Sequence, residues 1–135
     1  DIAISAEEAS FALTEVKLGL AAAVISLTVF HRMDPRSASL TALSGETFSG
    51  KEAAAYGLVT QAVPAAALDA HVTTLVAKVA TGAAQGIRET KKVLNRELIA
   101  RIDADGEEMA DLSTQLFGSD EAREAMTAFL SRPRS

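Results

Sequence analysis

The feature that most constrains the fold is a change of pattern at Pro64. After Pro64, apolar residues recur at spacings of three and four up to the C-terminus, which predicts helices only. Before it, short extended stretches alternate with capped helices, a mixture typical of an α/β unit. We therefore expect a small α/β part over residues 1–64 and a helical region over residues 65–135. The first helical stripe comprises Leu68, Val72, Leu75, Val76 and Val79.

The helical region is predicted to contain four amphipathic helices. Gly82 ends the first, and a second stripe runs over 87–102. The acidic segment 103–108 is interpreted as an interruption followed by a new helix, with acids in its first turn, rather than as a calcium loop. Helical stripes over 109–117 and 122–130 follow, separated by the break at 118–120. Four such helices carry more apolar surface than they can bury on one another, so part of it should meet residues 1–64 or another subunit.

The first region has clear helix signals. Asp34-Pro35 predicts a helix start, and Gly45 a left-handed helix end. Ser49 and Glu52 have the spacing of a capping box, with Phe48 placed to staple the first turn of a helix that stops at Gly57. The remaining predicted elements are strands over 1–5, 10–13 and 58–63, and a helix over 21–31 that should be buried because it is apolar on nearly every face.

Composition limits the function. The 135 residues fit one ordinary domain, and a net charge of −5 argues against a nucleic-acid partner. The chain has no cysteine, which excludes disulfides and thiolate metal sites and fits a reducing, cytoplasmic location. The uncharged run 18–30 is too short to span a membrane. His31 and His71 have no partner at metal spacing, so no metal is expected. The start without Met leads us to expect a longer parent protein.

The most informative single residue is Glu15, which lies among apolar neighbours just before the uncharged run. Burial there would raise the pKa of its carboxyl group towards neutrality, and such a group exchanges protons readily. The alternative is a surface glutamate that is solvated or paired with Lys17. Local sequence alone leaves both readings open.

Four stretches resemble one family in its order along the chain. Residues 1–11 resemble the strand and turn that follow a glycine-rich segment. Residues 11–20, FALTEVKLGL, are similar to F-x-x-P-E-V/I-x-L-G-L. Residues 43–64 resemble L-T-G-x-x-x-x-A-x-E-A-x-x-x-G-L-V followed by V-P. Residues 119–130 are similar to the closing S-x-D-x-x-E-G-x-x-A-F helix. This family is the crotonase, or enoyl-CoA hydratase/isomerase, superfamily, and the resemblance is to its C-terminal half.

The resemblance implies part of a ββα spiral core, followed by a helical C-terminal trimerisation region. It implies an acyl-CoA substrate, no further cofactor, and a homotrimer or a dimer of trimers. Two backbone N–H groups would stabilise an enolate on the thioester oxygen. Glu15 falls on the second of two glutamates that flank the added water, whereas the first glutamate and both N–H donors would precede Asp1. The implied activity is enoyl-CoA hydration. Double-bond isomerisation and a non-catalytic binding or assembly role remain alternatives.

The resemblance also assigns substrate contacts to Ala23, Phe129 and Arg132. A core position remains the alternative for Phe129, and a solvated tail for Arg132. Two departures from the family pattern bear on the reaction. Thr14 replaces the usual proline before the glutamate, and residues 21–26 replace a Pro-Gly-rich stretch that helps to position water. The second departure weakens the case for hydration without affecting the oxyanion chemistry.

Overall fold

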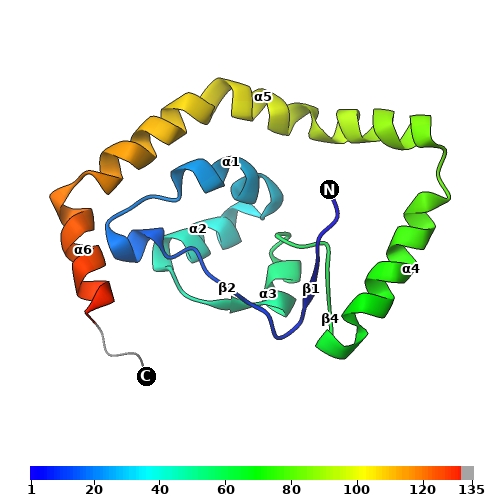
Figure 1. Cartoon of the computed structure of the whole chain (residues 1–135), viewed down its shortest axis with the longest axis horizontal. Helices are drawn as coiled ribbons and strands as arrows, with labels where there is room; N and C mark the ends of the chain where they lie inside the picture. The colour runs from blue at the N-terminus through cyan, green and yellow to red at the C-terminus, as the bar shows by residue number, and fades with distance from the viewer. Residues whose placement is uncertain (132–135) are drawn as a thin grey trace.

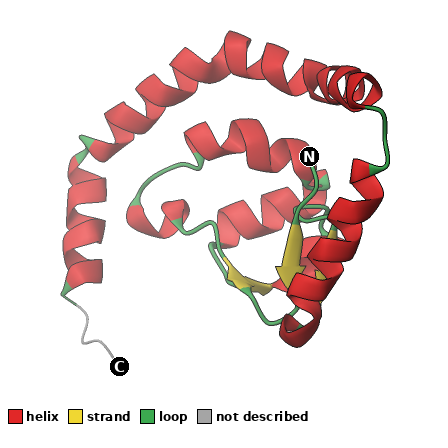
Figure 2. Ribbon diagram, turned by 45° about the vertical axis from the view of Figure 1, so that its right-hand side comes forward, coloured by secondary structure: helices red, strands yellow, loops and turns green. Residues whose placement is uncertain are grey.

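The computed structural model of the chain describes residues 1–131, and it shows a small core framed on three sides by helices (Figure 1). Two short strand pairs lie within this frame (Figure 2). Strand β1 (Ile4–Ala6) pairs in parallel with β4 (Gln61–Val63), and β2 (Ser10–Phe11) pairs antiparallel with β3 (Phe48–Ser49). The predicted strands are therefore present, although each is shorter than the sequence pattern suggested.

Two helices of the first region begin where their caps predicted, and one of them also ends at the predicted glycine. The Asp34 side chain accepts hydrogen bonds from two backbone N–H groups at the start of α2 (Pro35–Ser44). Gly45 ends that helix at φ 62°, a left-handed conformation that favours glycine. Ser49 and Glu52 form the predicted capping box of α3 (Gly50–Ala55). These local signals are confirmed because each is satisfied within a few residues.

The core of the first region is a small cluster beneath α3. Phe48 and Ala53 are buried together with Val59, which confirms the predicted staple. The Phe48 ring stacks on Phe11 with 5.7 Å between centroids, and Tyr56 tilts against the same ring at 5.6 Å. The aromatic residues of the chain are few, so this cluster accounts for much of the aromatic packing.

Helix α1 (Ala23–Arg32) differs from its prediction. Its sequence is apolar all round, yet only Ala23 and Leu27 are buried, and Val24 is 52% exposed. The reason is that α1 packs on α5 along one side, while part of the remainder faces an open cavity. The expected full burial of this helix is wrong for the chain as described.

The second region contains three described long helices rather than four. After the short turn η2 (Ala65–Ala67) come α4 (Leu68–Ala80), α5 (Ala84–Phe117) and α6 (Asp120–Leu130). Helix α5 runs unbroken for 34 residues through 103–108, so the predicted interruption and new helix start are wrong. A single glycine at position 106 costs a helix only about 1 kcal/mol relative to alanine, and the apolar stripes on either side continue one another. Among residues 1–131, neither the acidic segment 103–108 nor any other part contains a cluster of side chains that could hold a metal ion.

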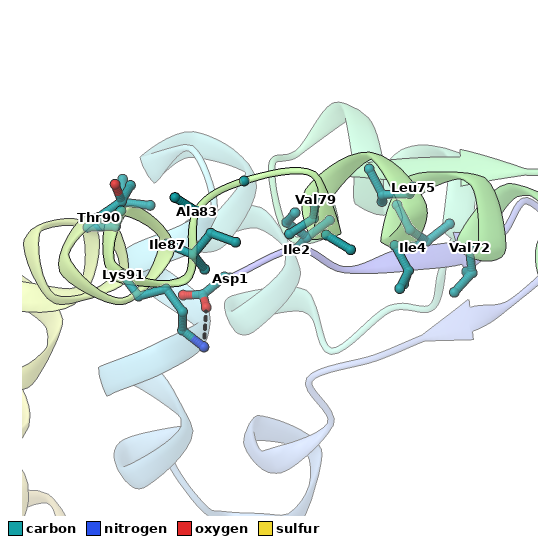
Figure 3. Close-up of a pocket in the computed structure, with 15 residues that line it drawn as sticks. Asp1, Ile2, Ile4, Val72, Leu75, Val79, Ala83, Ile87, Thr90 and Lys91 are labelled. Carbon is teal, nitrogen blue, oxygen red and sulfur yellow. Dashed lines mark ion pairs between the residues drawn. The ribbon is translucent and has the colours of Figure 1, made fainter.

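The predicted excess of apolar surface is present on α4. Val76 is 60% exposed, and it lines a groove of about 1030 Å³ between α4, the start of α5 and strand β1. Figure 3 shows Ile2 and Ile4 on the strand side of this groove and Val72 and Val79 on the helix side. None of the helices in residues 1–131 combines the length and hydrophobicity needed to cross a bilayer. The boundary between residues 64 and 65 stays a prediction.

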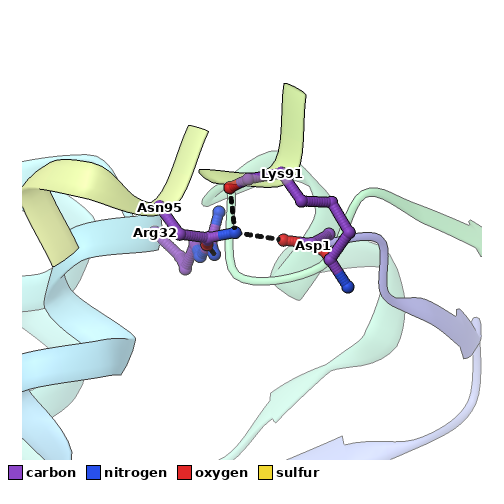
Figure 4. Close-up of polar contacts among 4 residues, drawn as sticks. All are labelled: Asp1, Arg32, Lys91 and Asn95. Carbon is purple, nitrogen blue, oxygen red and sulfur yellow. Dashed lines mark hydrogen bonds and ion pairs between the residues drawn. The ribbon is translucent and has the colours of Figure 1, made fainter. Parts of the chain in front are cut away.

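A polar network ties the chain start to the long helix (Figure 4). The Asp1 carboxylate contacts Lys91 Nζ at 2.9 Å and accepts a hydrogen bond from Asn95 Nδ2 at 2.8 Å. Asn95 Oδ1 in turn accepts one from Arg32 at the end of α1, at 3.5 Å. The start of the chain and the C-terminal end of α1 are thereby attached to the same two turns of α5.

Candidate active site

Glu15 is the first residue of η1 (Glu15–Leu18), a short 3₁₀ turn between β2 and α1. The backbone of the turn closes on itself, because Leu20 N–H donates to Glu15 O at 3.0 Å. Gly19 follows the turn and lies directly against Glu121 and Ala122 of α6. The position of the Glu15 backbone is therefore fixed both by its own turn and by a helix more than 100 residues further along.

The Glu15 side chain is partly buried and lines a cavity of about 450 Å³. One wall is formed by Leu20, residues 21–25 and Thr28, at the start of α1. The opposite wall comes from the C-terminal end of α5, namely Ser113, Leu116 and Phe117. Because α5 packs along α1, its last turns face the turn that carries Glu15. The cavity is within the range typical of sites for small organic groups.

Lys17 does not neutralise Glu15. Its Nζ lies 2.8 Å from Oε1 of Glu46, and this hydrogen bond lowers the pKa of the Glu46 carboxyl group. Among residues 1–131, the Glu15 carboxyl group forms no ion pair or hydrogen bond. The paired alternative for Glu15 is thus not observed, and its carboxyl oxygens remain available to a group in the cavity.

Of the other predicted site residues, one lies at the cavity with Glu15, one lies away from it, and one falls outside the described part of the chain. Ala23 is 5% exposed and lies on the cavity wall with Glu15. Phe129 is 57% exposed on α6, so it is not a core residue of this chain, and it does not line the described cavity. Arg132 lies outside the described residues. The substrate-binding roles of all three stay predictions.

Sequence reasoning missed the contribution of α5 to this site. Ser113, Leu116 and Phe117 lie about 100 residues after Glu15, and only tertiary packing brings them to it. One signal was available. Ser113 falls four residues after Met109 and three before Leu116, so it shares a helix face with these apolar residues. A polar side chain on an otherwise apolar face is unusual and points to a site.

The fold and the site together define a class of protein. A partly buried carboxyl group faces an apolar cavity between a ββα-type core and a helical C-terminal region. The family model described as Enoyl-CoA hydratase/isomerase matches residues 1–134. The chain belongs to this enoyl-CoA hydratase/isomerase family, and its fold is a partial crotonase core followed by helices.

Relatives of known structure or curated sequence support this assignment. The chain is similar to a crystal structure of an enoyl-CoA hydratase from Mycobacterium avium, with 42% identity and a TM-score of 0.92 over 96% of this chain and 51% of that one. A carnitinyl-CoA hydratase from the same species matches at 26% identity, TM-score 0.84, over 96% of this chain and 51% of the other. An (E)-benzylidenesuccinyl-CoA hydratase from Thauera aromatica is 32% identical over 73% of this chain and 40% of its own length. The chain thus spans about half of the two solved structures and 40% of the curated relative.

Proposed function

We propose that the protein containing this chain is an enoyl-CoA hydratase, which adds water across the 2,3-double bond of an acyl-CoA thioester. One observation carries the proposal. The Glu15 carboxyl group lines an otherwise largely apolar cavity, in a chain of the enoyl-CoA hydratase/isomerase family. A carboxyl group held this way has the chemistry of a general acid or base.

The proposed reaction needs one proton transfer on each side of the double bond. Water gives one proton to a base as its oxygen bonds to C3, the C2–C3 double bond opens, and the π-electron pair moves towards the thioester oxygen to form an enolate. A proton then adds at C2, so that the product carries OH at C3 and one more hydrogen at C2. We assign to Glu15 the exchange of a proton with water or with C2. Donors to the thioester oxygen would come from another segment of the full protein. The thioester itself activates the double bond, so no cofactor beyond coenzyme A in the substrate is proposed.

Double-bond isomerisation is the second candidate. Glu15 is the one titratable group among the described residues that line the cavity, and a single carboxyl group suffices to move a proton between C4 and C2. Small side chains at 21–23 stand where the family pattern places residues that position water. Both observations suit isomerisation at least as well as hydration.

Oxygen-18 water separates the two reactions. The full-length protein that contains this chain is incubated in labelled water with 2-butenoyl-CoA and, separately, with 3-butenoyl-CoA. The reaction products are then analysed by mass spectrometry. Hydration places the label at C3 of the product from 2-butenoyl-CoA. Interconversion of the two substrates without label supports isomerisation. Binding of both thioesters without turnover identifies a non-catalytic member of the family.

The assembly and location are part of the same proposal. We propose a homotrimer or a dimer of trimers in the cytoplasm, with the exposed apolar surface of the helical region among the surfaces buried on assembly. Exposed residues such as Leu94, Phe117 and Leu130 support this. Light scattering after size exclusion gives the mass directly. A monomer at micromolar concentration would overturn the assembly part and leave the chemistry standing.

A further inference from the structure

The turn that carries Glu15 packs directly against the first turn of α6. Gly19, which closes η1 at φ 67°, lies so near that a Cβ built on it would be 3.3 Å from Ala122 N and 3.4 Å from Ala122 Cα. Ala122 is completely buried, and no other residue of α6 is buried. The two backbones therefore meet with no room between them, and a larger side chain at Ala122 must push η1 and α6 apart.

The first turn of α6 is in turn fixed to the end of α5. The Ser119 hydroxyl accepts a hydrogen bond from Ala122 N at 3.1 Å and donates one to Leu116 O at 2.7 Å. The Ser119 backbone N–H also donates to Leu116 O, at 3.0 Å. Because these bonds lie at the corner between the two helices, Ala122 cannot shift alone, and α6 meets η1 as a rigid body.

The turn itself offers little other restraint on Glu15. Thr14, which precedes it, makes no side-chain capping hydrogen bond and lacks the fixed φ of proline. On the side of α2, the turn meets Gly45 through the Lys17 side chain, which is flexible and half exposed. The Glu15 carboxyl group has no bonded partner among residues 1–131. The position of this group therefore follows the backbone of η1, which α6 touches directly.

We propose that Ala122 is a positioning residue for Glu15, and that its packing on Gly19 holds the carboxyl group within reach of the proton that it transfers. The inference rests on the proposed function for the role of Glu15, and it deepens that function by naming the residue through which α6 acts. Proton transfer needs heavy atoms about 2.6–3.2 Å apart. A shift of the turn by about 1 Å would therefore impair the transfer while leaving substrate contacts made elsewhere intact.

Ala122→Val in the full-length protein tests this role. We expect kcat with 2-butenoyl-CoA to fall by about tenfold to a hundredfold, with KM nearly unchanged, because the variant misplaces the carboxyl group and removes no binding contact. Ala128→Val is the matched control, since it makes the same change at an exposed position of the same helix, with a similar loss of helix propensity. Equal kcat values in the two variants would overturn the inference and leave the hydratase proposal intact.

Combination with Glu15→Gln separates positioning from a general loss of folded protein. If Ala122 acts through Glu15, adding Ala122→Val to the Glu15→Gln variant should lower kcat no further, because the group that is positioned has already been removed. A role in stability alone would lower kcat by the same factor in both backgrounds. That result would contradict the inference.

Amide hydrogen exchange tests the contact without any reaction. The backbone N–H groups of Gly19 and Leu20 both donate to Glu15 O, so their exchange reports the closure of the turn. We expect these amides to exchange about tenfold faster in Ala122→Val than in Ala128→Val, because overpacking opens the turn locally. Unchanged exchange would refute the inference whatever the activity. Faster exchange in a protein whose Glu15→Gln variant retains full activity would support the contact and refute the catalytic role of Glu15.

Discussion

Gly50→Ala should be among the most destabilising small substitutions in the chain. Gly50 is buried at the first turn of α3, and a Cβ built there would lie 1.9 Å from the carbonyl oxygen of Ala6 and 2.9 Å from Ser5 Oγ. Real Cβ atoms essentially never approach another atom within 3.0 Å, so β1 and α3 must separate by about 1 Å. That movement also strains the hydrogen bond that the Gly50 N–H donates to Ala9 O, in which nitrogen and oxygen lie 2.8 Å apart.

The expected loss is about 3 kcal/mol in the free energy of unfolding, at the upper end for overpacking because the obstacle is backbone and cannot rotate away. Gly106→Ala is the matched control. A Cβ there meets only Ile102 Cγ2 at 4.0 Å, so the change should raise stability by about 0.5–1 kcal/mol. Urea unfolding followed by circular dichroism measures both. Unchanged stability in Gly50→Ala, or a loss in Gly106→Ala, would refute the reasoning, and the second result would indicate a break in α5.

Three further predictions concern the caps and the polar network. The Ser49 backbone N–H donates to the Glu52 carboxylate at 2.7 Å and lowers the pKa of Glu52. The resulting stabilisation is present above the usual glutamate pKa of about 4.3 and is lost as the pH falls through the lower pKa of the folded state. Glu52→Gln should therefore flatten the acid side of the curve of stability against pH. Ser119→Ala removes the bond to Ala122 N at 3.1 Å and should cost about 1 kcal/mol, whereas Ser119→Asp should retain the cap; equal unfolding midpoints would contradict this. Asn95→Ala should cost about 0.5–1 kcal/mol and speed amide hydrogen exchange in β1, because it removes one of the two side-chain contacts that hold Asp1 on α5. Unchanged exchange would show that this hydrogen bond does not help to hold the strand.

Local features of the fold were predictable from the sequence, and long-range ones were not. Asp34, Gly45 and the Ser49–Glu52 capping box act within one helical turn, so their residue types suffice. The continuity of α5 through Gly106 was missed because acidic residues and a glycine suit both a helix start and a solvent-exposed helix interior. The exposure of Val24 was missed because burial depends on what packs opposite, and the pattern of α1 does not contain that information.

The candidate site shows the same division. Glu15 and Ala23 belong to one continuous stretch, and their shared cavity wall follows from that proximity. The wall formed by Ser113 and Phe117 depends on how a 34-residue helix crosses α1, which no local pattern specifies. The resemblance to the family located the carboxyl group, whereas the structure located the residues opposite it.

The most direct test of the account is the rate of Glu15→Gln with 2-butenoyl-CoA. The amide keeps the size of the side chain but cannot act as an acid or a base, so we expect kcat to fall by about 10²- to 10⁴-fold with little change in thermal stability. Glu8→Gln makes the same chemical change at an exposed position after β1 and should leave kcat unchanged. If Glu15→Gln and Glu8→Gln turn over substrate at the same rate, the carboxyl group in the cavity takes no part in the chemistry and the central claim is wrong.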